Sequence, residues 1–339
     1  MKKIKVGING FGRIGRILLR IISERPNMEV VAINNPGLVP EYAKYNFTHD
    51  TIHGRFKGKC EVKNGDLVVN GKRIKILGGQ TPNDIPWNEY GVDYVFDATG
   101  KFKSKAELQG HLENGAKKVV LTAPGDSDIP MFVYGVNHDT YTQDMDIVSN
   151  ASCTTNCLAP LTKVIDDAFG IEEALMTTVH SATSSQKVVD SSSKKDYRGG
   201  RAASYNIIPS ATGAAKAVGV VIPHLKGKIT GMSFRVPTLN VSVVDLTAKL
   251  KKPTDYDKIV SVMKKAEKGA FNGIIGTTDE PAVSSDFISE PRTCMFDITA
   301  GIMLSPTFVK LVAWYDNEWG YSEMTIKMLE HIHSVSAKK

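Results

Sequence analysis

A glycine-rich turn near the start of the chain constrains its fold more than any other feature. A short apolar strand ends at the run Gly10–Gly15, whose sequence Gly-Phe-Gly-Arg-Ile-Gly fits the spacing G-x-G-x-x-G. A helix with one apolar face follows over residues 16–22, and a second apolar strand follows over 29–33. Within such a strand–turn–helix–strand unit, this spacing predicts a parallel α/β sheet of the Rossmann type that binds a dinucleotide at the turn.

Each glycine of the turn has its own expected role. Gly10 allows the tight turn, Gly12 lets the backbone approach a pyrophosphate, and Gly15 lets the helix pack on the strand. The helix N-terminus would then receive the phosphate charge, because its unpaired N–H groups carry a partial positive charge. The expected cofactor-binding residues of the turn are Gly10, Phe11, Gly12, Arg13 and Ile14.

The end of the second strand departs from the usual dinucleotide pattern. An Asp or Glu there accepts the ribose 2′-hydroxyl of NAD, whereas this strand ends with Ile33-Asn34-Asn35-Pro36. A carboxylate would repel the 2′-phosphate of NADP, but the neutral amide of Asn35 can donate to it. Alternatively, Asn35 still bonds the 2′-hydroxyl and changes the affinity only modestly. Most of the sequence information on cofactor choice therefore lies at this position.

A second motif, Ser152-Cys153-Thr154-Thr155-Asn156-Cys157, joins a short apolar strand to a helix with an apolar face. A cysteine nucleophile must be a thiolate, and a helix N-terminus or a nearby imidazolium favours that form. Cys153 is predicted at such an N-terminus, and His180 ends a later strand that can lie beside it. The alternative is that the two residues are unrelated, as most distant Cys/His pairs are. Cys157 is interpreted as a small buried residue, because zinc sites do not usually have its spacing from Cys153.

Composition indicates a soluble enzyme of a reducing compartment. At 339 residues the chain exceeds the usual single core, which predicts two domains. Its 4 cysteines are scattered, and no apolar run approaches the roughly 18 residues of a membrane span. The sequence begins with a strand pattern, from which we expect no signal peptide. The net charge of +6 comes from scattered lysines rather than from a basic stripe. We therefore expect a cytoplasmic protein with no membrane, metal or nucleic-acid requirement.

The hydrophobic pattern divides the chain near residue 152. Before this point strands alternate with helices, and hairpins are predicted at the Asn64-Gly65 and Asn70-Gly71 turns. After it, longer strand-like runs are typical of an α+β domain with an antiparallel sheet. The serine-rich stretch 181–200 is either a disordered loop or a functional one. The predicted domains are residues 1–152 for nucleotide binding, 153–318 for catalysis and 319–339 as a C-terminal helix that returns to the first domain.

Several sequence blocks, taken together, are specific to one family. They are GINGFGRIGR, SNASCTTNCLAPL, TTVHSATSSQ, SKKDYRGGRAAS, NIIPSATGAAKAVG, RVPTLNVSVVDL and WYDNEWGY. With them the chain resembles the phosphorylating glyceraldehyde-3-phosphate dehydrogenases over nearly its whole length. The resemblance implies oxidation of D-glyceraldehyde 3-phosphate to 1,3-bisphosphoglycerate with a nicotinamide cofactor and inorganic phosphate. It also implies a homotetramer, in which a long loop over about 181–205, the S-loop, packs across a subunit interface.

The resemblance assigns roles to residues at matching positions. Cys153 would attack the aldehyde, and His180 would keep the thiol ionised and then act as the base when hydride leaves. The C3 phosphate of the substrate would be bound by Thr183, Ser185 and Arg235. The attacking phosphate would be bound by Ser152, Thr154, Thr212 and Gly213. The cofactor site would be completed by Thr99, Thr122, Asn317 and Tyr321.

Two departures from the family pattern favour the use of NADP as well as NAD. The family usually has Asp at the position of Asn35 and Pro at the position of Ser192. Relatives that use NADP commonly carry Ser in place of that Pro, and its hydroxyl can bond a 2′-phosphate. Lys194 or Lys195 of the same loop can add positive charge. The alternatives are strict NAD dependence, erythrose-4-phosphate dehydrogenase activity, and a non-catalytic protein that binds RNA or another partner.

Overall fold

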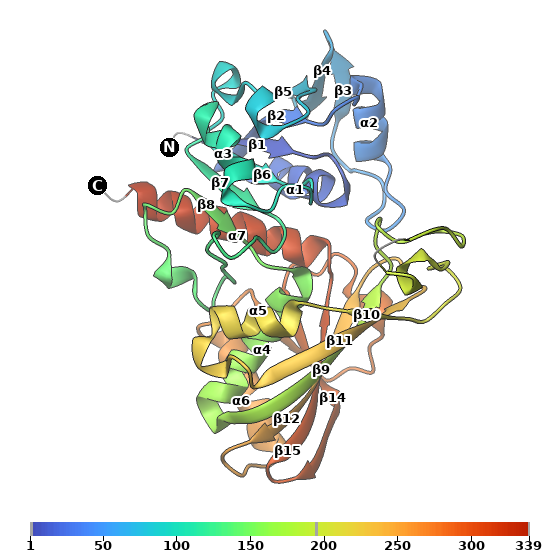
Figure 1. Ribbon diagram of the computed structural model, residues 1–339, viewed down its shortest axis with the longest axis vertical. Helices are drawn as coiled ribbons and strands as arrows, with labels where there is room; N and C mark the ends of the chain where they lie inside the picture. Colours follow the sequence, from blue (N-terminus) through green and yellow to red (C-terminus); the bar gives the residue numbers. More distant parts are fainter. Residues whose placement is uncertain (1–2, 194–195, 338–339) are drawn as a thin grey trace. The chain divides into compact units, whose positions relative to one another are not determined.

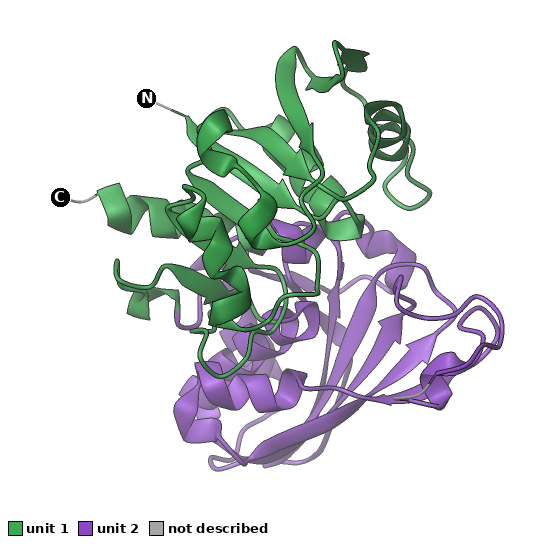
Figure 2. Ribbon diagram, turned by 45° about the horizontal axis from the view of Figure 1, so that its top comes forward, with its two compact units in different colours: residues 1–132, 138–151, 325–339 green, residues 133–137, 152–324 purple. Residues whose placement is uncertain are grey.

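The computed structural model describes residues 3–193 and 196–337 of the chain. The chain divides into two compact units, which Figure 2 colours separately. Unit 1 comprises residues 1–132, 138–151 and 325–339, and unit 2 comprises residues 133–137 and 152–324. The assignment of separate functions to residues 1–152, 153–318 and 319–339 remains a prediction.

Unit 1 is built on an 8-stranded sheet (Figure 1). In spatial order its strands are β3 (Cys60–Lys63), β4 (Asp66–Val69), β5 (Lys72–Leu77), β2 (Met28–Asn34), β1 (Ile4–Asn9), β6 (Tyr94–Asp97), β7 (Lys118–Leu121) and β8 (Ile147–Ser149). In this spatial order the strands β5, β2, β1, β6, β7 and β8 all run parallel to one another. Successive strands are added first on one side of β1 and then on the other, which is the Rossmann order and confirms the predicted fold class.

Amphipathic helices accompany this sheet. Helix α1 (Arg13–Ser23) buries Ile17, Leu18, Ile21 and Ile22 along one face. The other helical segments of unit 1 are α2 (Pro40–Thr48), α3 (Lys105–Glu113), the later part of α7 (Trp319–Ala337), and 3-10 turns at Pro82–Asp84, Trp87–Tyr90 and His138–Thr140. Helix α3 begins after Ser104, because the side chains of Ser104 and Glu107 cap it reciprocally.

The two predicted hairpins are present at the edge of the unit 1 sheet. Strands β3, β4 and β5 pair in antiparallel fashion through the Asn64-Gly65 and Asn70-Gly71 turns. Both residues of each turn have a positive φ, with values of 52° and 79° in the first turn and 49° and 79° in the second. Two positive φ angles define the turn type that Asn-Gly favours, so the local sequence determined these hairpins.

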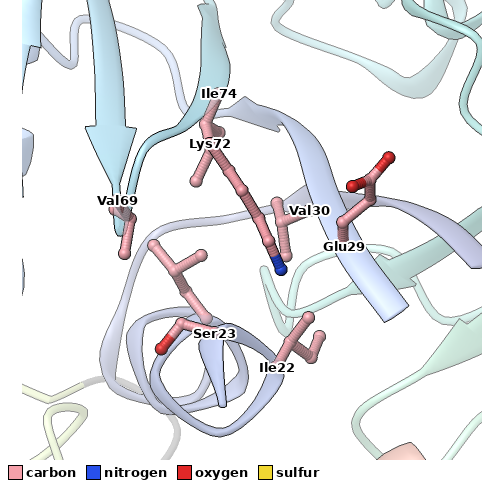
Figure 3. A pocket seen from close by; sticks show the side chains of 8 residues that line it. Ile22, Ser23, Glu29, Val30, Val69, Lys72 and Ile74 are labelled. Carbon is pink, nitrogen blue, oxygen red and sulfur yellow. The ribbon is translucent and has the colours of Figure 1, made fainter. Parts of the chain in front are cut away.

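A narrow apolar pocket in unit 1 is lined by side chains of α1, β2, β4 and β5 (Figure 3). Ile22, Val30 and Val69 border it, and Lys72 crosses it with its amino group directed toward α1. Burial, followed by the charge of Lys3, lowers the pKa of Lys72. No predicted site residue lines this pocket, so we assign it to the packing of helix on sheet.

Unit 2 contains a 7-stranded sheet. In spatial order its strands are β10 (Ile208–Ala211), β11 (Ile229–Val236), β9 (Ile171–Ser181), β12 (Ser242–Leu250), β15 (Phe308–Tyr315), β14 (Cys294–Ser305) and β13 (Ile275–Thr278). Most neighbours are antiparallel, as predicted, but β11 runs parallel to β9 and β13 runs parallel to β14. A long connection returns the chain to the same end of the sheet in both cases, and strand patterns alone do not reveal such a connection.

Among the described residues, helices cover one face of the unit 2 sheet and leave the other face bare. Helices α4 (Cys153–Phe169), α5 (Ala214–Val221) and α6 (Tyr256–Lys268) pack against its strands and lie together on one side in Figure 1. Short 3-10 turns occur at Arg198–Gly200, Pro223–Leu225 and Ser284–Phe287. Strand register places five large exposed apolar side chains on the opposite face: Leu175, Met232, Ile302, Leu304 and Phe308.

Candidate active site

Cys153 is the first residue of helix α4. The helix begins there because the Ser152 hydroxyl accepts a hydrogen bond from the backbone N–H of Thr155 at 3.1 Å. Ala151, just before this cap, has a φ of 54° in the left-handed region, which is uncommon for a residue with a Cβ atom. The first turn of α4 contains no acidic residue, so no carboxylate of that turn offsets the positive helix end next to the thiol.

His180 comes from strand β9 and lies beside the cysteine. Its Nε2 atom is 3.5 Å from Sγ of Cys153. The residue is 4% exposed, and its ring meets that of Tyr315 edge-on with the ring centroids 6.0 Å apart. The structure therefore brings together the two residues that the sequence proposes as nucleophile and base.

Arg235 lies at the other ring nitrogen of His180. Strand β11 runs parallel to β9 with Arg235 in register with His180, and Nη1 of Arg235 is 2.7 Å from Nδ1 of the imidazole. The backbone carbonyl of Ser181 is 2.8 Å from the same Nδ1. A cation and a carbonyl therefore compete for one nitrogen, while the other nitrogen faces the thiol.

Burial and the Arg235 charge decide the protonation of this pair. Burial, followed by the positive charge of Arg235, lowers the pKa of His180 to about 4. Burial also raises the pKa of the Cys153 thiol, although the Arg235 charge opposes this. Neither group is therefore stable as an isolated charge. Both shifts favour the neutral thiol and the neutral imidazole, and the 3.5 Å contact places Nε2 where it can accept the thiol proton.

The hydroxyls expected at the substrate phosphate follow strand β9. Oγ1 of Thr183 and Oγ of Ser185 lie 3.0 Å apart, and Gln186 accepts the backbone N–H of Thr183 at 3.0 Å. No hydrogen bond joins these hydroxyls to Arg235 among the described residues. Their grouping with Arg235 around one anion therefore remains a prediction.

The residues expected at the attacking phosphate lie at two helix N-termini. Ser152 and Thr154 belong to the start of α4, and Thr212 and Gly213 precede α5, where the Thr212 hydroxyl accepts a backbone N–H at 3.2 Å. Helices α4 and α5 pack on one another. The Thr154 hydroxyl lies 2.8 Å from that of Tyr315, and the Ser152 hydroxyl caps α4. Because both hydroxyls already have partners, we expect the backbone N–H groups of the helix starts to be the main donors to an anion.

Two of the residues expected at the cofactor come from the segment after strand β15. Oδ1 of Asn317 accepts hydrogen bonds from the hydroxyls of Ser181 and Ser242, each at 2.9 Å. Tyr321 is buried in helix α7. Asn317 is therefore linked to the residue that follows the base, a connection that the sequence did not predict.

The glycine turn in unit 1 has the geometry that a dinucleotide needs. A Cβ atom on Gly15 would lie 2.0 Å from the carbonyl oxygen of Gly10, so helix and strand approach closely only without a side chain there. Gly10 itself has a φ of 95°. Around Gly12 no described atom lies within 4 Å of such a Cβ, which leaves room for a pyrophosphate. Helix α1 carries no acid in its first turn, so the turn fits the expected cofactor.

The other residues of unit 1 that are expected at the cofactor lie at the carboxyl ends of its strands. Oδ1 of Asn35 accepts the backbone N–H of Phe11 at 3.1 Å, which ties the end of β2 to the glycine turn. The Thr99 hydroxyl donates to Asp97 at 2.7 Å, and the backbone N–H of Thr122 donates to the Asp97 carbonyl at 2.9 Å. Adjacent strand ends of this kind form the usual binding edge of a parallel sheet.

The S-loop has internal structure in unit 2. Asp190 accepts hydrogen bonds from the Arg201 side chain at 2.9 Å and from the Ala202 backbone at 3.0 Å. Ser192 is exposed on this loop. Lys194 and Lys195, which the sequence offers as partners of a 2′-phosphate, lie outside the described residues.

Sequence reasoning missed two residues that hold site residues in place. Asp50 binds Arg13 of the glycine turn through two oxygens, at 2.5 and 3.2 Å. Burial would raise the pKa of Asp50, but the hydrogen bond from Arg13 and two backbone N–H groups lower it to about 2. Tyr315 holds Thr154 and, at 2.9 Å, Thr178. Tyr315 stands in the WYDNEWGY block, whereas no local pattern marks Asp50.

The described part of the chain contains neither a cluster of metal-binding side chains nor a helix suited to span a membrane. Within residues 3–193 and 196–337, no three His, Cys, Asp or Glu side chains are grouped so that they could hold a metal ion. None of the helices described there has the length and apolar character that a membrane span requires.

Comparison with known proteins identifies the family. The sequence profile described as "Glyceraldehyde 3-phosphate dehydrogenase, NAD binding domain" matches residues 4–105, and the profile for the C-terminal domain of the same enzyme matches residues 152–317. The chain is 59% identical to a glyceraldehyde-3-phosphate dehydrogenase of Ogataea parapolymorpha over 98% of its own length and 99% of that protein. It is 57% identical to glyceraldehyde-3-phosphate dehydrogenase 3 of Saccharomyces cerevisiae, over 97% and 99% of the two chains. The chain therefore belongs to the glyceraldehyde-3-phosphate dehydrogenase family.

Proposed function

We propose that this protein oxidises D-glyceraldehyde 3-phosphate to 1,3-bisphosphoglycerate, with NAD as the electron acceptor and inorganic phosphate as the second substrate. The observation that carries the proposal is the contact of Cys153 with one nitrogen of His180 and of Arg235 with the other. This arrangement supplies a nucleophile, a base and a cation for a phosphorylated aldehyde. The name shared by the similar yeast proteins supports the same substrate.

The side chains of unit 2 account for the proton transfers. Sγ of Cys153 adds to the aldehyde carbon, and the thiol proton passes through Nε2 of His180 to the new oxygen, which gives a thiohemiacetal. His180 then removes the hydroxyl proton while hydride leaves the same carbon, which gives a thioester. NAD, when bound, accepts this hydride. Inorganic phosphate attacks the thioester carbon and expels the Cys153 thiolate, which forms the acyl phosphate.

The cofactor proposal includes NADP as an alternative to NAD. We propose that the turn from Gly10 to Ile14 and the strand-end residues Asn35, Thr99 and Thr122 hold the dinucleotide. The Phe11 N–H occupies Oδ1 of Asn35, whereas the amide nitrogen makes only a long 3.3 Å bond to the Pro36 carbonyl. That nitrogen can therefore donate to a 2′-phosphate. Relatives of erythrose-4-phosphate dehydrogenase tend to lose the block Thr-Gly-Ala-Ala-Lys-Ala, which this chain keeps at residues 212–217, and its retention speaks against that alternative.

We also propose that the protein is a cytoplasmic homotetramer. The bare face of the unit 2 sheet exposes Leu304 at 80% and Ile302 at 62%, and the S-loop exposes Tyr197 at 85% and Val188 at 77%. Apolar groupings of this kind mark interfaces, and a second copy of the chain is the occupant we propose. Native mass spectrometry should show a tetramer, and Leu304→Asp should yield smaller species. A wild-type monomer at working concentration would contradict the proposal.

The cytoplasmic location has support from a similar protein of Gracilaria gracilis that is described as cytosolic.

The reaction is tested by following reduced cofactor at 340 nm with purified protein, glyceraldehyde 3-phosphate and NAD. We expect steady turnover with phosphate or arsenate, and a stop after one equivalent per subunit when both anions are omitted. The thioester would then persist because nothing cleaves it. Sustained turnover without either anion would show hydrolysis by water and would exclude the phosphorylating reaction.

A further inference from the structure

The turn that begins strand β12 is strained and is held by two adjacent side chains. Val241 has a φ of 62°, which is an outlier for a β-branched residue. Asn240 donates to Asp316 at 2.8 Å, and Ser242 donates to Asn317 at 2.9 Å. Strain of this kind persists only where the surroundings fix the backbone, and it concentrates at functional sites.

Ser242 is the centre of a closed set of buried hydrogen bonds. Its hydroxyl accepts the backbone N–H of Ser181 at 3.1 Å and donates to Oδ1 of Asn317 at 2.9 Å. The Ser181 hydroxyl donates to the same Oδ1 at 2.9 Å. Ser181, Ser242 and Asn317 are 0%, 1% and 7% exposed, so water does not readily replace these bonds.

The hydrogen bonds among Ser181, Ser242 and Asn317 connect to His180 through the backbone carbonyl of Ser181. The backbone N–H and the hydroxyl of Ser181 are both fixed, so its carbonyl is held 2.8 Å from Nδ1 of His180. A carbonyl accepts a proton from Nδ1 and thereby leaves Nε2 unprotonated toward the Cys153 thiol. Arg235, which also contacts Nδ1, would favour the opposite tautomer. The Ser181 carbonyl and Arg235 thus act in opposite directions on Nδ1, and a carbonyl that is held in place favours the tautomer whose Nε2 can act as a base.

The same set orients the Asn317 amide. Two hydroxyls donate to Oδ1, so the NH₂ group must occupy the other position. No hydrogen bond from that NH₂ group to the protein occurs among the described residues, which leaves it available to a carbonyl of a ligand such as the nicotinamide carboxamide.

We propose that Ser242 is a positioning residue whose hydroxyl fixes both the imidazole of His180, through Ser181, and the amide of Asn317. The proposal rests on the proposed function, because it gives Asn317 a role toward the nicotinamide. It predicts that one buried hydroxyl sets two separate properties, the reactivity of the thiol and the affinity for NAD.

The experiment compares Ser242→Ala with Ser233→Ala. Ser233 is a matched control, since it is a serine of β11 that is 2% exposed and whose hydroxyl has no hydrogen-bond partner in the described structure. Two quantities are measured without substrate: the Kd for NAD by calorimetry, and the rate of Cys153 alkylation by iodoacetamide in the absence of NAD. For Ser242→Ala we expect a Kd roughly tenfold weaker and alkylation roughly fivefold slower than in the control, the usual effect of losing one or two buried hydrogen bonds.

Two further variants separate the effect on NAD affinity from the effect on thiol reactivity. Ser181→Ala removes one bond to Asn317 but keeps the backbone contacts, so NAD binding should weaken while alkylation stays within about twofold of the control. Ser242→Thr keeps the hydroxyl and should restore both quantities. If Ser242→Ala matches Ser233→Ala in both measurements, the proposal is wrong. If Ser242→Ala does not fold, unchanged NAD binding in Ser181→Ala overturns it instead.

These measurements do not depend on the identity of the aldehyde. If the wild-type protein fails to oxidise glyceraldehyde 3-phosphate, the proposed function fails, whereas NAD binding and alkylation still decide whether Ser242 positions the two side chains.

Discussion

Nη1 of Arg235 lies 2.7 Å from Nδ1 of His180, on strands that run side by side in parallel register. The guanidinium therefore disfavours a second positive charge on the imidazole. Arg235 is also the residue that we propose for the phosphate of the substrate. An anion bound by Arg235 would offset the guanidinium charge and make proton uptake by His180 easier. If Arg235 holds the substrate phosphate as proposed, this one contact links substrate binding to the strength of the base.

Arg235→Gln should weaken substrate binding and raise the pKa of His180. Losing a charge-assisted hydrogen bond costs roughly 1.5–3 kcal/mol of binding free energy, so KM for glyceraldehyde 3-phosphate should rise by tenfold or more. Burial and the Arg235 charge both lower the pKa of His180 to about 4 in the native protein. The variant keeps the burial but loses the charge, so the pKa of His180 should rise. NMR titration of labelled histidine measures this shift. A pKa that stays at the wild-type value would show that Arg235 does not control the ring.

Cys153→Ser should abolish dehydrogenase activity, whereas Cys157→Ser should retain most of it. Cys153 is partly exposed at the start of α4, while Cys157 is fully buried one helical turn later. Burial raises the pKa of the Cys157 thiol well above its usual range, so this thiol is the less reactive of the two. Mass spectrometry after brief iodoacetamide treatment provides the check. Faster labelling of Cys157 would reverse the assignment.

His180→Asn should lower kcat by about 10²–10⁴, the usual contribution of a positioned acid–base group. The side chain is buried and lies 3.5 Å from the nucleophile, and the amide of Asn cannot accept the thiol proton as the imidazole does. Single-turnover kinetics separate this loss from a change in binding. Wild-type rates in this variant would assign the base to another group.

The native protein should reduce NADP as well as NAD, and Asn35→Asp should restore a preference for NAD. The carboxylate would still accept the Phe11 N–H, as Oδ1 of Asn35 does at 3.1 Å, but it would repel a 2′-phosphate. Ser192→Pro should add to the effect if the exposed loop donates to that phosphate. The ratio of kcat/KM for the two cofactors is the measurement. Absence of any NADP activity in the native protein would show that Asn35 is only a tolerated substitution.

Folding lowers the pKa of Asp50 from 3.8 to about 2, which means that the charged carboxylate stabilises the folded state. Asp50→Asn removes this charge and should lower the free energy of unfolding by about 2 kcal/mol at pH 7. A lowered carboxyl pKa stabilises the fold above the unfolded pKa, and this contribution is lost as the pH falls through the folded value. The difference in the free energy of unfolding between variant and wild type should therefore shrink as the pH falls from about 4 to about 2. Urea unfolding at several pH values tests this. Glu172→Gln, at an exposed pair with Lys249, is the control and should have little effect.

Local sequence determined the elements whose geometry depends on near neighbours. The glycine turn follows from the close approach of Gly10 and Gly15, the hairpins follow from Asn-Gly pairs with positive φ, and Cys153 begins a helix because Ser152 caps it. In each case the interacting atoms lie within a few residues of one another, so the pattern of residue types contains the information.

Only the tertiary structure decided which distant groups meet. The order of the strands in the unit 2 sheet places Arg235 beside His180, and the packing of α4 on that sheet places Cys153 at its other ring nitrogen. The sequence proposed that Cys153 and His180 meet, but it did not predict the parallel pairs at β11 and β13, the ion pair of Arg13 with Asp50, or the bonds of Ser242 to Ser181 and Asn317. Their partners are far apart along the chain, and burial makes each of these bonds strong only after the whole core has assembled.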